Sequence, residues 1–104
     1  MGADEFQQYA DGADPAEAFR DACEEARHEY GHRGYTGTLA EKDDYIVIEG
    51  KPTPRELAEA LASRLVRDDD PRIRDKWGPA GAIAVAADGS TGIAGWLFFG
   101  LASC

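Results

Sequence analysis

Apolar residues recur every three or four positions in two stretches of the chain, which predicts two amphipathic helices. The first stretch begins at Asp14 and Pro15, a favourable N-cap followed by proline at the first helical position. Gly31 is a natural C-terminal stop for this helix. Its predicted apolar face is made of Ala18, Phe19, Ala22, Cys23, Ala26 and Tyr30.

The second helical stretch follows Thr53-Pro54-Arg55-Glu56, which has the spacing of a capping box with proline at the first position. The acidic run 68–70 and the proline after it end the helix. Its predicted buried stripe is made of Leu57, Ala58, Leu61, Ala62, Leu65 and Val66.

Four segments rich in β-branched, aromatic and small apolar residues predict strands over 35–41, 44–50, 82–87 and 94–102. A polar turn at 42–44 joins the first two as a hairpin, and the last two are apolar on both faces, which is typical of central strands. We therefore expect an α+β domain over 14–104 with the order α-β-β-α-β-β. It would have a four-stranded, mainly antiparallel sheet with both helices packed on one face. Residues 1–13 would form a loose acidic lead-in from which Phe6 and Tyr9 could still dock.

The net charge of the chain bears on which partners it can bind. The 20 acidic and 11 basic residues give a formal net charge of −9, which repels nucleic acid and anionic membranes and suits a protein partner with a basic surface. Acidity of this kind is also typical of a protein adapted to a salty cytoplasm. The two cysteines make no disulfide framework; Cys23 fits a helix core and Cys104 an exposed chain end. With no apolar run of membrane-spanning length and no signal-like start, a cytoplasmic protein is expected.

The stretch His28-Glu29-Tyr30-Gly31-His32 spells the H-E-x-x-H motif of zinc peptidases. In that chemistry His28 and His32 would bind zinc on one helical face, and Glu29 would be the general base. The glycine at 31 interrupts the helix, and the chain has no third histidine. The simpler interpretation is a solvated histidine at a helix end, with a zinc hydrolase as the alternative.

Two further clusters have the composition of binding surfaces. The segment 30–38 carries Arg33 and Tyr35 among glycines, and the basic connector 72–81 carries Trp77. Tyr, Trp and Arg are frequent anchors of protein interfaces. A buried Trp77 that fixes its loop against the sheet is the commoner alternative. Trp96, Phe98 and Phe99 are either core residues or a row of exposed aromatics that would mark a partner or homodimer surface.

By the motifs GYTGTLAEK, KWGPAG and WLFFG, the chain resembles small α+β proteins of prokaryotes and their phages, to which no activity is attached. Size and acidity are similar to those of anti-CRISPR and other anti-defence inhibitors, by analogy alone. The leading hypothesis is a non-catalytic binding protein that occupies a basic, nucleic-acid-binding surface of its partner. Besides Arg33, Tyr35 and Trp77, its expected binding residues are the acidic Glu24, Glu25, Glu29, Asp43, Asp44, Asp68, Asp69 and Asp70.

Overall fold

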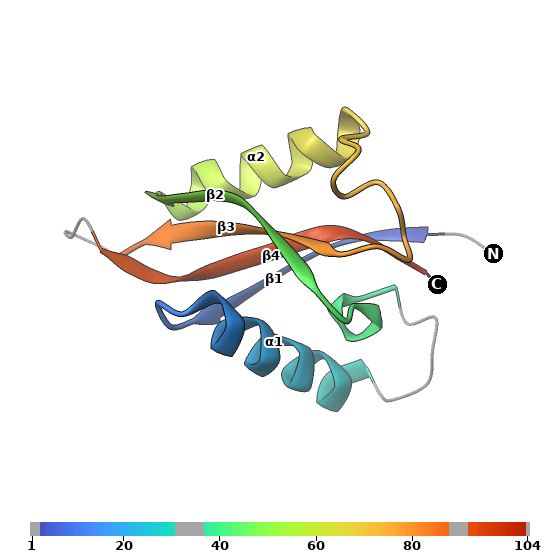
Figure 1. The fold of residues 1–104 in the computed structure, drawn as a ribbon, viewed down its shortest axis with the longest axis horizontal. Coiled ribbons are helices and arrows are strands. Elements are labelled where there is room, and N and C mark those ends of the chain that lie inside the picture. The colour runs from blue at the N-terminus through green and yellow to red at the C-terminus, as the bar shows by residue number, and fades with distance from the viewer. Residues whose placement is uncertain (1–2, 31–36, 88–91, 104) are drawn as a thin grey trace.

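The computed structural model describes residues 3–30, 37–87 and 92–103 and shows a four-stranded sheet covered by one helix on each face (Figure 1). Along the chain, the elements are β1 (Ala3–Asp11), α1 (Pro15–Tyr30), the short 3-10 helix η1 (Leu39–Glu41), β2 (Tyr45–Thr53), α2 (Arg55–Arg67), β3 (Ala80–Ala86) and β4 (Ile93–Ser103). The sheet order is β1-β4-β3-β2. β4 is antiparallel to both of its neighbours, whereas β2 and β3 are parallel and joined through α2. The α+β class and the mainly antiparallel sheet are thus confirmed.

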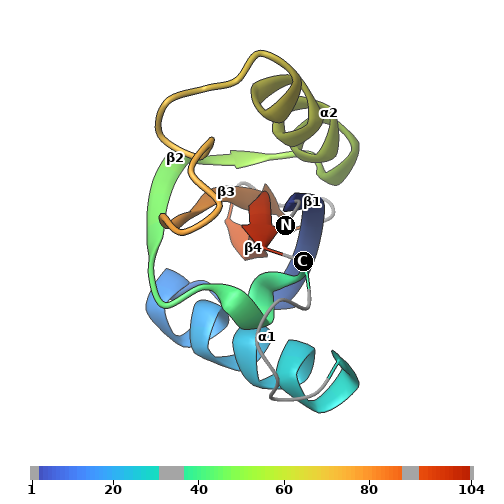
Figure 2. The ribbon, with the colours of Figure 1, turned by 90° about the vertical axis from the view of Figure 1, so that its right-hand side faces the viewer.

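The prediction that both helices lie on one face of the sheet is wrong. α1 and α2 lie on opposite faces, so that the molecule has three layers (Figure 2). The reason lies in β4, where Trp96 and Phe98 point into the α1 core while Leu97 and Phe99 point into the α2 core. A sheet whose central strands are apolar on both sides needs a helix on each. All four side chains are buried, so these aromatics belong to the core and form no exposed dimer surface.

The segment 1–13, expected to be a loose lead-in, contains the edge strand β1. It pairs with β4 from Ala3↔Ser103 to Asp11↔Gly95. Phe6 and Ala10 enter the α1 core, while most of the other β1 side chains are exposed or half-buried. Two buried positions among the nine residues of β1 leave too little apolar pattern to identify the strand from the sequence.

The strand predicted over 35–41 is also wrong where the structure describes it, because Leu39–Glu41 is a 3-10 helix. Its N-cap is Thr38, whose hydroxyl accepts a hydrogen bond from the Ala40 N–H at 3.2 Å. The predicted hairpin to β2 therefore does not form. Residues 31–36, including that part of the prediction, lie outside the described residues.

The two long helices are confirmed, but only one of their predicted caps is. Asp14 accepts a hydrogen bond from the Ala16 N–H at 3.0 Å, as an N-cap does. At α2 the N-cap is Pro54, and the Thr53 hydroxyl instead donates to the Lys51 carbonyl at 2.8 Å, so the capping box is absent. Leu57, expected in the buried stripe, is 61% exposed.

Lys42 follows η1 and was expected in a polar turn, yet its side chain is only 1% exposed. Its ammonium donates to the carbonyls of Asp75, Lys76 and Gly78 at 3.4, 3.0 and 2.9 Å. Burial lowers the pKa of Lys42 below its usual value, and the Asp75 carboxylate partly offsets this. Three acceptors match the three N–H donors of a protonated amine, so the charged form is the one that this site fits.

Replacing Lys42 with methionine keeps much of the apolar stem but removes the donor to three part-buried carbonyls, of which that of Asp75 keeps the Gly78 N–H as another donor. We expect Lys42→Met to lower the free energy of unfolding by about 2–3 kcal/mol. Denaturant unfolding followed by circular dichroism measures this. Lys51→Met, at an exposed position of β2, is the matched control and should change stability by less than about 0.5 kcal/mol. Equal stability of the two variants would show that the Lys42 contacts contribute nothing.

Candidate functional site

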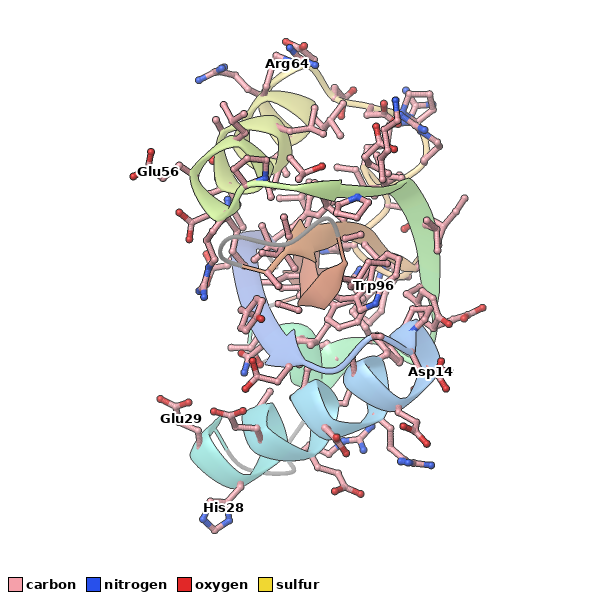
Figure 3. The ribbon with its side chains drawn as sticks, turned by 90° about the vertical axis from the view of Figure 1, so that its left-hand side faces the viewer. Asp14, His28, Glu29, Glu56, Arg64 and Trp96 are labelled. Carbon is pink, nitrogen blue, oxygen red and sulfur yellow. The ribbon has the colours of Figure 1, made fainter. Side chains whose placement is uncertain are left out.

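The H-E-x-x-H motif does not form a metal site within the described residues. His28 and Glu29 are both exposed, and the His28 ring points away from the sheet on the outer side of α1, whereas Glu29 points to a different side of the helix (Figure 3). α1 ends at Tyr30, and His32 lies outside the described residues. In the ranges 3–30, 37–87 and 92–103, no three His, Cys, Asp or Glu side chains come together as a metal would require. The described residues by themselves therefore offer no set of three ligands for a zinc ion.

The contacts of Lys42 position the loop that carries Trp77. The loop follows α2 and leads into β3, and the Lys42 ammonium bonds the carbonyls on both sides of Trp77. Within the loop, the Asp75 carboxylate accepts the Trp77 N–H at 2.9 Å, and the Asp75 carbonyl accepts the Gly78 N–H at 2.9 Å. The backbone of the loop is thus held from inside the protein.

The Trp77 side chain itself is 64% exposed, so the expectation of a buried tryptophan is wrong. The Lys76 ammonium lies 5.6 Å from the centroid of the Trp77 ring, within the range of a cation–π contact. A large aromatic ring on a firmly held loop can bind a partner with little loss of conformational entropy.

Beside this loop, a cleft of about 220 Å³ lies between α1 and the residues that follow η1. It is lined by Phe19, Arg20, Cys23, Glu24, Arg27, Lys42 and Asp43. The Phe19 ring is held by Tyr45 and Phe98, with ring centroids 5.1 and 5.3 Å away. The cleft therefore combines an aromatic wall with charged side chains of both signs.

The cysteine of the cleft is poorly suited to act as a nucleophile at neutral pH. Burial raises the pKa of the Cys23 thiol to about 11, so that the thiolate is scarce. The sulfur lies 3.8 and 3.9 Å from the carbonyls of Leu39 and Lys42, and Cys23 is buried as the sequence predicted. This cysteine joins α1 to η1.

The structure brings together only some of the predicted binding residues. Glu24 and Asp43 line the same cleft. Asp44 is exposed next to them, and its carbonyl accepts the Ala80 N–H at 3.0 Å, three residues after Trp77. Glu25 and Glu29 are exposed further along the helix, whereas Arg33 and Tyr35 lie outside the described residues.

The run Asp68–Asp70 lies at the end of α2, in the opposite layer, and interacts with basic residues of the same chain. Asp70 accepts hydrogen bonds from the Arg72 backbone N–H at 2.9 Å and from its guanidinium at 3.0 and 2.9 Å. Asp69 lies 3.8 Å from the Arg74 guanidinium. Much of the charge of this run is thus balanced internally.

Several residues of the site carried no signal in the sequence. Lys42 looked like a turn residue, because nothing in its neighbours indicates burial. The sequence predicts the helix that carries Phe19 and Arg20, but the cleft that they line forms only when η1 folds against that helix. Their part in the site therefore depends on a tertiary contact.

No family model, curated protein or solved structure matches the chain. Within the described parts of the chain, neither helix has the length and apolarity that a membrane span requires.

The contacts of Asp70 generate a pH prediction. Hydrogen bonds from Arg72 lower the pKa of the Asp70 carboxyl from 3.8 to about 2. Because the folded pKa is depressed, the pair contributes stability above the unfolded value of 3.8 and loses it as the pH falls through about 2. A carbon NMR titration of the Asp70 carboxyl should give a midpoint near 2 in the wild type and a higher midpoint in Arg72→Gln, which loses the guanidinium but keeps the backbone N–H bond. The same midpoint in both proteins would contradict the assignment.

Proposed function

We propose that this chain is a non-catalytic protein-binding module whose α1 layer docks on a basic surface of a partner protein. The main support for this proposal is the uneven distribution of charge along the chain. Residues 1–44 hold 12 of the 20 acidic residues and only 4 of the 11 basic ones. The remaining 60 residues hold 8 acidic and 7 basic residues, close to neutrality.

The fold turns this asymmetry along the chain into an asymmetry in space. The described parts of residues 1–44 are β1, α1 and η1, which form one edge of the sheet and the layer on one face. The opposite layer, α2, carries Glu56 and Glu59 against Arg55, Arg64 and Arg67. Glu56 and Arg64, which have opposite charges, both point outward from α2 (Figure 3), while α1 has five carboxylates against two arginines.

The uneven distribution of charge also helps to decide between a docking surface and a domain that is acidic only because it is adapted to a salty cytoplasm. Adaptation to a salty solvent acts on every exposed surface, because all of it must be kept hydrated. Here the α1 side carries the excess while the α2 side is nearly balanced. A one-sided field orients an approaching charged partner and speeds its encounter. The asymmetry therefore favours docking over solvent adaptation.

In its narrower form, the proposal concerns partners that bind nucleic acid, because such proteins gather lysine and arginine on one surface to hold phosphates. An acidic layer that occupies this surface would compete with the nucleic acid. Anti-defence inhibitors of phages and mobile elements act in this way, and we propose the same mode for this chain.

Charge reversal on the two layers tests the proposal. Glu25→Lys/Glu29→Lys alters the α1 layer, and Glu56→Lys/Asp68→Lys changes the net charge equally on the other side; all four side chains are exposed. Each variant is immobilised and used to capture partner proteins at low salt from a lysate of the cells in which the protein naturally occurs. We expect the first variant to lose a captured basic protein, with binding weakened about tenfold or more, and the second to keep it.

Binding to the captured partner should also weaken steeply as salt is raised, because exposed charges are screened. If both variants captured the partner equally well, the α1 layer would not be the docking surface. Affinity that did not change with salt would contradict an electrostatic mechanism.

A further inference from the structure

A docking surface that binds through charge alone does not explain the exposed Trp77, nor the buried Lys42 that holds its loop. Trp77 and Leu57 are the two most exposed of the large hydrophobic side chains in the described residues, at 64% and 61%. Leu57 lies on a regular helix, whereas the Trp77 loop is held by the buried charge of Lys42. Burying a charge is costly, so a loop held in this way is strongly specified.

The surroundings of Trp77 favour a cationic occupant. The Asp75 carboxylate accepts the Trp77 N–H at 2.9 Å, and the exposed Asp43 and Asp44 lie near the same segment, since the Asp44 carbonyl accepts the Ala80 N–H at 3.0 Å. On the far side of Lys42, Glu24 lines the cleft of α1. The ring already attracts the ammonium of Lys76, which shows the interaction that a partner cation would make.

We infer that Trp77 is the aromatic anchor of the docking surface and stacks against an arginine side chain from a basic segment of the partner. This inference rests on the proposed function, since it names the contact through which the acidic side engages its partner. Arginine fits better than lysine because its planar guanidinium stacks on an indole while donating to carboxylates at its edge. Asp43 and Asp44 are the carboxylates that would receive those donors.

Proton NMR of the two indole N–H groups tests this contact. Trp96 is 4% exposed and its indole N–H donates to the Ala13 carbonyl at 2.9 Å, so its signal is an internal reference for the fold. The probe is a twelve-residue peptide of alternating arginine and glycine, compared at low salt with the lysine and glutamate versions. Trp77→Phe assigns the two signals.

We expect the arginine peptide to shift the Trp77 indole signal and the amide signals of Asp43 and Asp44, and to leave the Trp96 indole unchanged. The lysine peptide should bind more weakly, and the glutamate peptide should cause no shift. Trp77→Ala should weaken binding of the arginine peptide about five- to thirty-fold without changing its salt dependence. Leu57→Ala, which removes an equally exposed apolar side chain, should leave binding unchanged.

The outcomes separate this inference from the proposed function. If the arginine peptide shifted signals of α1 while the Trp77 indole did not move, the inference would be overturned and the acidic docking surface would stand. If the Trp77 shift and the affinity persisted in Glu25→Lys/Glu29→Lys, the α1 layer would be excluded and the Trp77 contact retained. No binding of the arginine peptide at low salt would overturn both.

Discussion

The arrangement of this protein around its exposed tryptophan depends on one buried ammonium group. Lys42 comes from the segment between η1 and β2, and its three acceptors lie in the loop between α2 and β3. It therefore links the α1 side of the sheet to a loop that arrives from the α2 side. Because the charge is buried, the carbonyls must stay in place to satisfy it. The position of Trp77 follows from this constraint.

The central strands impose the second constraint. Since β3 and β4 are apolar on both faces, the chain covers each face with one helix. Alanines at the contact, such as Ala22 on α1 and Ala62 on α2, let both helices approach the sheet closely. The two outer surfaces are then free to differ, and they do so in charge. One side is acidic and carries the cleft, and the other is nearly neutral.

Elements with a strong local pattern could be predicted from the sequence, and those that depend on distant contacts could not. The two helices and the strands β2, β3 and β4 follow from apolar periodicity and β-branched runs. β1 could not be predicted because most of its side chains are polar and its pairing partner, β4, lies at the other end of the chain. The placement of both helices on one face is wrong because central strands that are apolar on both sides need a helix on each, a consequence that the apolar pattern of β3 and β4 already implied. Glu24 and Asp43 were identified as exposed charges, but their shared cleft depends on the fold. The burial of Lys42 and the exposure of Trp77 had no local signal at all.

If Lys42 holds the Trp77 loop in place, the loop should open more readily without it. Amide hydrogen exchange at Trp77 and Gly78, measured in the wild type and in Lys42→Met, tests this. Exchange at a core amide such as that of Phe98 reports the change in global stability. We expect Lys42→Met to lose protection at Trp77 and Gly78 by more than this global change. Loop protection that falls only in step with Phe98, or does not fall, would show that Lys42 does not hold the loop.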